Sequence, residues 1–142
     1  MNAALTTLPY RYLIVDDDVF SAKCLATALT RFGAADILNA ENGAIAVGLL
    51  EDAALLPDII ICDLNMPELD GVEYLMHLAK SQFSGGIILI SGTSPKLLSS
   101  VMRLATAHRL NVLGTLVKPV SMDDLIQMLT RFGDEKNAAV SG

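Results

Sequence analysis

The chain is poor in several features that define common protein classes. Its 142 residues include only two cysteines, Cys24 and Cys62, which is too few for a disulfide framework and lacks the spacing of a metal site. We therefore expect both thiols to lie in the core of a protein kept in a reducing compartment. Lysine and arginine number 10 against 16 aspartates and glutamates, a formal net charge of -6. That balance argues against a nucleic-acid binder with a basic face.

Long apolar runs are also missing from the sequence. No stretch approaches the length needed to span a membrane, and the N-terminus lacks a basic region followed by an apolar one. We therefore expect a cytoplasmic protein that does not bind membranes. A GxGxxG loop for a dinucleotide is absent as well.

What is present is the composition of one well-filled domain. Hydrophobic residues make up 52% of the chain and charged residues 18%, which is typical of a globular protein with a proper core. We predict an N-terminal extension over residues 1–10, a folded domain over 11–132, and a flexible tail or the start of a linker over 133–142. Gly133 is expected to end the last helix.

Five short apolar runs alternate with segments of helical periodicity. Runs such as Ile59-Ile60-Ile61 are apolar without alternation, which is typical of parallel strands covered on both faces. Five such units predict an α/β fold, a single-domain doubly wound (βα)5 sandwich with strand order 2-1-3-4-5. The predicted strands are Arg11–Asp16, Asp36–Ala40, Asp58–Cys62, Gly86–Ser91 and Val112–Val117. The predicted helices are Val19–Phe32, Gly43–Ala53, Val72–Gln82, Pro95–His108 and Met122–Phe132.

Local signals support several of these boundaries. Asp18 directly precedes the first predicted helix and is expected to cap it, and Asp70 is expected to do the same before the third. Ser94 before Pro95 is typical of a helix start. Ser121 with an aspartate three residues on resembles a capping box.

Carboxylates follow two strands that the predicted order makes neighbours. Asp16 and Asp17 end the first predicted strand and Asp63 ends the third, so all three converge on one crevice at the sheet's carboxyl edge. Like charges gathered there are unfavourable without a cation. The cluster therefore predicts Mg2+, with Asp17 and Asp63 as direct ligands, Asp16 acting through water, and the main-chain carbonyl of Asn65 adding an oxygen.

Two further strand ends supply what a phosphoryl-transfer site needs. Strand 4 ends at Ser91 and strand 5 at Lys118, so a hydroxyl and a fixed cation arrive beside the carboxylates. We expect Asp63 to attack a phosphoryl group in line while Lys118 and Ser91 hold the phosphoryl oxygens. The Asn65 side chain is either a turn residue or a neighbour of the phosphoryl group that affects its hydrolysis, and the sequence favours neither.

These residues, in this order and spacing, resemble the receiver domains of bacterial two-component response regulators. The resemblance runs from about Tyr12 to Phe132. It implies that Asp63 accepts a phosphoryl group from a histidine kinase or phosphotransfer protein in a Mg2+-dependent reaction. It also implies a cis peptide bond before Pro119. The matching pieces are Leu13–Asp18, Asp63–Gly71, Ser91-Gly92 and Lys118-Pro119.

One position departs from the family pattern. Thr115 stands where receivers often carry an aromatic residue that rotates inward, so the resemblance does not carry that readout over to this chain. Gly92, next to Ser91, is expected to keep the entrance open or to permit the turn. The resemblance places signalling, and a possible homodimer, on the face made by helix 4, strand 5 and helix 5. The output protein or domain is not identified.

Three other interpretations are open at this point. Residues 108–119 resemble, more weakly, receivers that precede a cyclic-di-GMP phosphodiesterase domain of the EAL type, so the chain could be a regulatory fragment of such an enzyme. A phosphatase of the haloacid-dehalogenase type also uses a strand-end aspartate, but it needs Asp-x-Asp, and the second position here is Asn65. A flavin carrier needs a phosphate cradle where Asp16, Asp17 and Asp18 would repel one.

Overall fold

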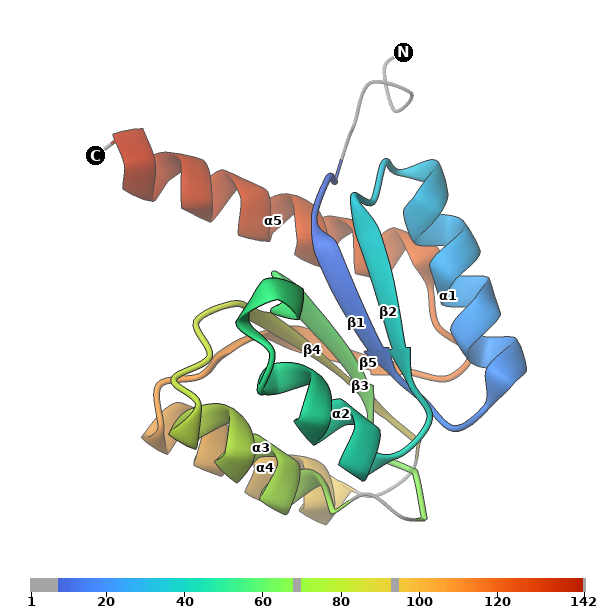
Figure 1. Cartoon of the computed structure of the whole chain (residues 1–142), viewed down its shortest axis with the longest axis vertical. Coiled ribbons are helices and arrows are strands. Elements are labelled where there is room, and N and C mark those ends of the chain that lie inside the picture. The colour runs from blue at the N-terminus through green and yellow to red at the C-terminus, as the bar shows by residue number, and fades with distance from the viewer. Residues whose placement is uncertain (1–7, 68–69, 93–94, 142) are drawn as a thin grey trace.

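The computed structural model describes residues 8–67, 70–92 and 95–141, with the backbone alone for residues 53, 95 and 136–141. Its strands form a single parallel sheet of order β2-β1-β3-β4-β5, which confirms the predicted α/β fold and strand order (Figure 1). Strands β1 and β3 are direct neighbours, as the convergence of the aspartates requires. The strands are β1 (Arg11–Val15), β2 (Asp36–Ala40), β3 (Ile59–Asp63), β4 (Gly86–Ser91) and β5 (Asn111–Val117).

The helices cover the two faces of this sheet. One core lies under α1 and α5, and a second lies under α2, α3 and α4 (Figure 1). A short 3-10 turn, η2, separates α2 from β3. The helical elements are α1 (Val19–Arg31), α2 (Gly43–Leu50), η2 (Ala53–Leu55), α3 (Gly71–Lys80), α4 (Pro95–Ala107) and α5 (Met122–Ser141).

The central strands are apolar because both of their faces are buried. In β1, Tyr12 and Ile14 point to the core under α1 and α5, while Leu13 and Val15 point to the core under α2, α3 and α4. All residues of β3 and β4 are buried. Because helices pack on both faces of the sheet, every residue of these strands faces an apolar layer. This explains the uninterrupted apolar runs in the sequence.

Three of the predicted helix caps are present. Asp18 accepts N–H bonds from Phe20 and Ser21 at the start of α1. Asp70 accepts from two backbone N–H groups at the start of α3. Ser121 Oγ accepts the N–H of Asp124, at 3.2 Å, at the start of α5. The predicted cap at Ser94 lies outside the described residues.

The predicted end of the last helix at Gly133 is wrong. Helix α5 continues to Ser141, where a tail was expected. A Cβ atom on residue 133 would lie 2.7 Å from the hydroxyl oxygen of Tyr10, so the glycine allows this tyrosine to cross the helix closely. The glycine therefore serves close packing, at a cost of about 1 kcal/mol relative to alanine in a helix.

The residues just before β1 belong to the packed structure. Leu8 is buried, and its N–H donates to the carbonyl of Phe32 at 2.6 Å. The Tyr10 ring packs edge-to-face against Tyr12 and Phe132, with ring centroids 6.1 and 5.3 Å apart. An extension beginning at residue 1 and a domain beginning at residue 11 remain predictions, but packing already begins at Leu8.

Two local features differ from expectation, and one strand pairing is irregular. Cys62 is buried as predicted, but Cys24 is exposed on α1. Helix α2 ends at Leu50 and not at Ala53, because Asp52 accepts the N–H of Ala54 and starts the separate turn η2. The pairing of β4 with β5 shifts register between Ile87 and Ile88.

Among the described residues, no helix is both long and apolar enough to cross a membrane.

Candidate functional site

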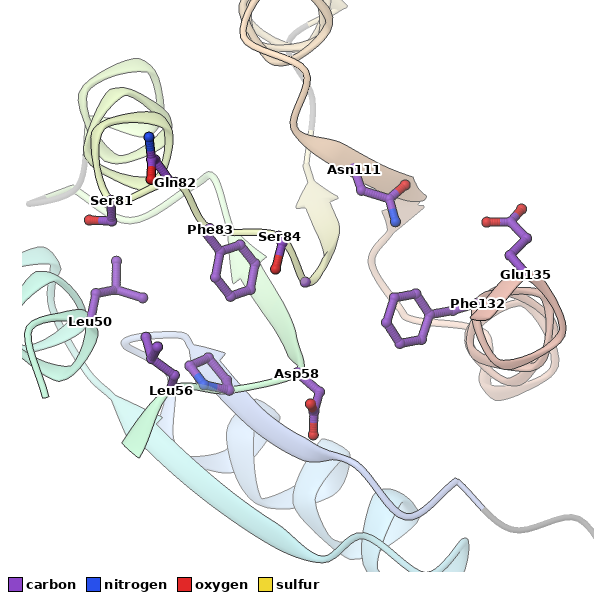
Figure 2. A pocket seen from close by; sticks show the side chains of 12 residues that line it. Leu50, Leu56, Asp58, Ser81, Gln82, Phe83, Ser84, Asn111, Phe132 and Glu135 are labelled. Carbon is purple, nitrogen blue, oxygen red and sulfur yellow. The ribbon is translucent and has the colours of Figure 1, made fainter. Parts of the chain in front are cut away.

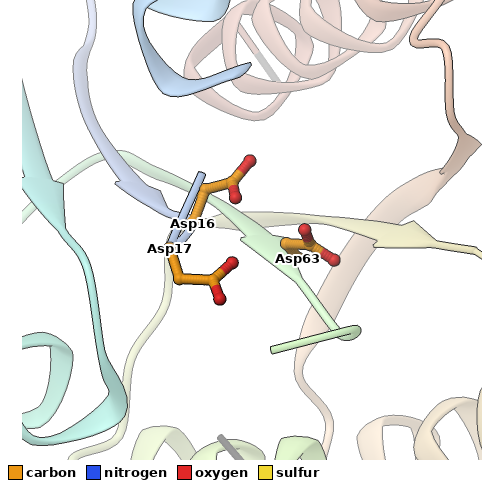
Figure 3. A group of neighbouring side chains, drawn as sticks. All are labelled: Asp16, Asp17 and Asp63. Atoms are coloured by element: carbon orange, nitrogen blue, oxygen red, sulfur yellow. The ribbon is translucent and has the colours of Figure 1, made fainter. Parts of the chain in front are cut away.

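Three aspartates meet at the carboxyl ends of β1 and β3. Asp16 and Asp17 follow β1, Asp63 ends β3, and one carboxylate oxygen of each lies within 4.8 Å of the others (Figure 3). Asp16 is 5% exposed and Asp63 is 2% exposed, whereas Asp17 is exposed. The predicted convergence is therefore present, with two carboxylates held in the sheet edge and a third at its rim.

Both carboxylate oxygens of Asp63 accept hydrogen bonds. Oδ1 accepts the backbone N–H of Asn65 at 2.8 Å, which turns the chain away from the sheet. Oδ2 accepts from Nζ of Lys118 at 2.7 Å, across 55 residues of sequence. Burial lowers the pKa of Lys118, but the hydrogen bond and negative charge of Asp63, with those of its neighbours, outweigh burial and leave the pKa raised. Lys118 is therefore a fixed cation beside Asp63.

Asp16 has only one of its two carboxylate oxygens hydrogen-bonded among the described residues. Its Oδ1 accepts the N–H of Asp18 at 2.9 Å. Its Oδ2 is buried with no hydrogen-bond partner among the described residues, and Lys118 Nζ is 3.9 Å away. Burial raises the pKa of Asp16, and the charge of Asp63 adds to that effect, while the Asp18 N–H and Lys118 oppose it. Such an oxygen is available to accept a hydrogen bond from water, including water bound to a cation.

The donor set fits Mg2+. Three carboxylates carry three negative charges and Lys118 carries one positive charge, so the group is left with two negative charges, which a divalent ion balances. Mg2+ prefers oxygen ligands and keeps several waters. The exposed Asp17 leaves one side of the group open to solvent.

Ser91 and Gly92 lie at the end of the strand next to β3. Ser91 is buried and ends β4, directly after Ile90, which pairs with Asp63. Gly92 packs against the side-chain amide of Asn65. A Cβ atom on residue 92 would overlap Asn65 Nδ2, so glycine is needed there for the amide to lie where it does. The contact links the two loops that follow Asp63 and Ser91.

Thr115 does not join the aspartate group. It lies in β5, paired with Leu89 and only partly buried. Two residues on, Val117 is 63% exposed at the end of the same strand. The peptide bond between Lys118 and Pro119 is cis, as the family resemblance implied.

An apolar surface beside the site was not predicted. Phe20 is 76% exposed and Val19 is 61% exposed, at the start of α1. Phe20 lines a hollow of about 490 Å³ that also contains Asp16, Cys24 and Lys118. The sequence contains one indication of this surface: the large apolar residues Val19 and Phe20 directly follow the capping Asp18 after β1. Other described residues lining the hollow are Ser21, Leu25, Ile90, Pro119, Val120 and Met122.

A separate cavity of about 480 Å³ lies at the opposite end of the sheet (Figure 2). The side chains of Phe83 and Phe132 line it, with Asp58 and Glu135 among its polar groups. The carboxylate of Asp58 accepts the N–H of Arg11 at 2.8 Å, where β1 begins. These residues precede their strands or lie on α5, so the cavity is not part of the aspartate site.

Comparison with known proteins supports the fold and indicates a family. The family model of the response regulator receiver domain matches residues 12–130. The cyclic di-GMP phosphodiesterase RocR of Pseudomonas aeruginosa is 35% identical over 120 residues, which is 84% of this chain and 30% of that protein. The chemotaxis protein CheY of Bacillus subtilis is 27% identical over 87% of this chain and 98% of its own length.

Solved structures agree with these sequence relatives. A response regulator from Colwellia psychrerythraea has a TM-score of 0.71 and 32% identity, covering 89% of this chain and 98% of that one. The signal receiver domain of a modulated diguanylate cyclase from Desulfovibrio desulfuricans has a TM-score of 0.72 and 28% identity, with 92% and 98% covered. Several curated relatives are longer proteins: the chain spans 30% of RocR and 45% of the positive alginate biosynthesis regulatory protein of Pseudomonas aeruginosa.

Proposed function

The chain belongs to the response regulator receiver domain family, and from that membership and the site's geometry we propose that Asp63 accepts a phosphoryl group from a histidine kinase or a phosphotransfer protein, in a Mg2+-dependent reaction. A receiver domain is a signalling switch and not a classical enzyme. The further proposal is that this chain promotes its own phosphorylation and dephosphorylation. A cytoplasmic location is part of the same proposal.

The contact between Asp63 and Lys118 is the observation that carries this proposal. In the transfer, a carboxylate oxygen of Asp63 forms a bond to phosphorus as the bond from phosphorus to the donor's imidazole nitrogen breaks. The electron pair of that bond stays on the imidazole, which takes up a proton on the donor side. Lys118, 2.7 Å from Asp63, is close enough to hold the phosphoryl oxygens, and Ser91 at the neighbouring strand end is proposed to assist.

The three carboxylates are proposed to hold Mg2+, together with the main-chain carbonyl of Asn65. When bound, the ion would neutralise charge on the phosphoryl oxygens and on the aspartates. The residues of the chain have distinct parts in this arrangement. Asp63 reacts, Asp17 binds directly at the open rim, and the buried Asp16 acts through water.

A donor protein has to approach Asp63 from the open side of the site. The exposed Phe20 and the hollow that it shares with Cys24 and Met122 lie directly beside Asp16 and Lys118. We propose that the helix bearing the donor's phosphohistidine packs on this hollow. Apolar contacts there would supply affinity without involving the reacting groups.

The consequence of phosphorylation is proposed to be a change in protein contacts. The face formed by α4, β5 and α5, which includes the exposed Val117, is the proposed output and homodimer surface. A second candidate role is regulation of an attached domain, supported by the 35% identity to part of the cyclic di-GMP phosphodiesterase RocR. A haloacid-dehalogenase type of phosphatase is less well supported, because Asn65 offers no second carboxylate.

The test is phosphorylation by a small donor. Incubation with acetyl phosphate and Mg2+ is expected to add one phosphoryl group, seen by intact-mass spectrometry, and the addition should be lost in Asp63→Asn and after chelation of Mg2+. Phe20→Ala is the matched variant for docking: it should leave acetyl phosphate labelling unchanged and slow transfer from a phosphorylated histidine phosphotransfer protein. Labelling that persists in Asp63→Asn would place the acceptor elsewhere.

A further inference from the structure

Helix α2 lies at the surface but carries no polar side chain. Its sequence is Gly-Ala-Ile-Ala-Val-Gly-Leu-Leu, from Gly43 to Leu50. Ala46 and Leu50 face the core, whereas Ala44, Ile45 and Gly48 are exposed, Ile45 to 40%. A surface helix normally has a polar outer face, and a helix that is apolar all round is normally covered. The outer face of α2 therefore has the composition of a contact surface.

A groove runs between α2 and α3. Its volume is about 530 Å³, and its α2 side consists of glycine, alanine and valine. A Cβ atom built on Gly48 would meet nothing within 4 Å, so the groove is open where the helix is thinnest. Small residues let another backbone approach closely, as at the contacts between packed helices. The described lining residues are Gly43, Ala44, Val47, Gly48, Glu51, Asp70, Glu73, Tyr74 and His77.

The rim of this groove is acidic. Glu51 stands at the end of α2, and Asp70 and Glu73 stand at the start of α3. No lysine or arginine is found among the described lining residues. Three carboxylates around an apolar trough match a partner that is positively charged on either side of an apolar or small-residue seam.

The α3 wall of the groove includes a tyrosine whose hydroxyl is buried behind it. Tyr74 lines it, is only 2% exposed, and carries a buried hydroxyl for which no hydrogen-bond partner is found among the described residues. Burial raises the pKa of this phenol far above its ordinary value, so the hydroxyl keeps its proton. A buried hydroxyl left unpaired costs free energy, but at this depth it is not available to a partner in the groove, which would contact the apolar and acidic residues of the lining.

We propose that the groove between α2 and α3 binds a basic amphipathic helix of another protein, with small residues of that helix on Gly48 and its lysines or arginines on Glu51, Asp70 and Glu73. The surface is separate from the aspartate site and from the hollow at Phe20. The proposal does not depend on phosphorylation of Asp63. Helix-in-groove recognition of this kind combines an apolar seam with charges on both sides of it.

A second copy of this chain is a poorer occupant. In a two-fold dimer the same patch faces itself, so α2 would meet α2 and each acidic rim would meet an equally acidic rim. The formal net charge of -6 adds a general repulsion between copies. Charge complementarity therefore favours a basic partner over self-association.

The proposal is tested with a synthetic helix-forming peptide about 20 residues long, with alanine along one face and lysine on both sides of it. Titrated into the isotopically labelled full chain, it should shift the amide resonances of α2 and the first turns of α3. A peptide with glutamate in place of lysine should not bind. Raising the salt concentration should weaken the interaction, since surface charges supply part of it.

Variants of the chain separate groove binding from general attraction. Gly48→Gln should fill the trough and weaken binding at least about tenfold, without lowering the melting temperature, since glycine is unfavourable within a helix. Glu51→Gln with Glu73→Gln should weaken it roughly threefold to tenfold. Asp134→Asn with Glu135→Gln, which changes net charge equally on α5, should leave it unchanged.

Three results of the peptide experiments would overturn the proposal. They are absence of resonance shifts with the lysine peptide, shifts centred on Phe20 or the aspartate site, and unchanged affinity in Gly48→Gln. Sedimentation velocity tests whether a second copy of this chain occupies the groove instead. A dimer of the wild-type chain that is lost in Gly48→Gln would assign the groove to self-association and refute a basic partner.

Discussion

Magnesium should stabilise this fold by an amount related to the charge at the strand ends. Carboxylate oxygens of Asp16, Asp17 and Asp63 lie within 4.8 Å of one another. At that distance two unit charges repel by about 3.5 kcal/mol with an effective dielectric constant of about 20. Lys118 offsets part of this through its 2.7 Å contact with Asp63. Solvent screens the exposed Asp17, but the remaining repulsion is large enough for a divalent ion to relieve measurably.

The size of the effect follows from linkage. A ligand that binds only the folded state at ten times its dissociation constant adds about 1.4 kcal/mol to the free energy of unfolding. For a chain of 142 residues, that free energy corresponds to a rise in melting temperature of about 3 to 5 °C. Thermal melts followed by circular dichroism, from chelated buffer into rising MgCl2 at constant ionic strength, measure this shift.

Asp16→Asn is the decisive variant for this prediction. It removes a buried charge whose Oδ2 has no hydrogen-bond partner among the described residues, so the melting temperature without Mg2+ should rise. The additional shift caused by Mg2+ should fall to less than half. Asp123→Asn, on the exposed first turn of α5, removes the same charge elsewhere and should keep the full shift. A wild-type melting temperature that does not respond to Mg2+, or equal shifts in both variants, would refute the reasoning.

Three further predictions concern single contacts. Gly92→Ala should displace the amide of Asn65 and shorten the half-life of the phosphorylated chain, measured by intact mass, and an unchanged half-life would show that the contact has no role. Gly48→Ala should raise the free energy of unfolding by about 0.5 to 1 kcal/mol in urea titrations, because the added methyl group meets open space. Tyr74→Phe should raise that free energy by about 1 kcal/mol, since it removes a buried hydroxyl that has no hydrogen-bond partner among the described residues. A loss above about 1 kcal/mol would reveal a partner for the hydroxyl.

The order of the sheet was predictable because burial on both faces leaves a simple pattern. Ile59-Ile60-Ile61 and Ile87-Ile88-Leu89-Ile90 have no polar interruption, and only a strand with a helix layer on each side uses such a run. Once five such strands alternate with helices, right-handed connections leave few topologies. The meeting of Asp16 with Asp63 then follows from β1 and β3 being neighbours.

The helix ends were less predictable, because a glycine can either end a helix or make room for a neighbouring side chain. Glycine after an amphipathic segment usually ends a helix, and Gly133 has that position. Here it makes room for Tyr10, which approaches from before β1, so the information lies more than 100 residues away in sequence. The exposure of Cys24 has a similar origin: it borders the hollow shared with Phe20, and the other wall of that hollow comes from Lys118 and Met122, far away in the sequence.

The site and the proposed donor surface share one segment. Lys118 holds Oδ2 of Asp63, and it also lines the hollow with Pro119 and Phe20. The proposed phosphorylation would replace one negative charge at Asp63 with about two, spread over three oxygens that extend beyond the carboxylate. We expect Lys118 to follow that charge and to carry the start of the loop between β5 and α5 with it. We expect a donor protein to bind the phosphorylated chain more weakly than the free one, because the acceptor's new charge alters the wall on which the donor packs. Equal affinities in calorimetry for the free and phosphorylated forms would show that the charge on Asp63 does not reach the surface on which the donor packs.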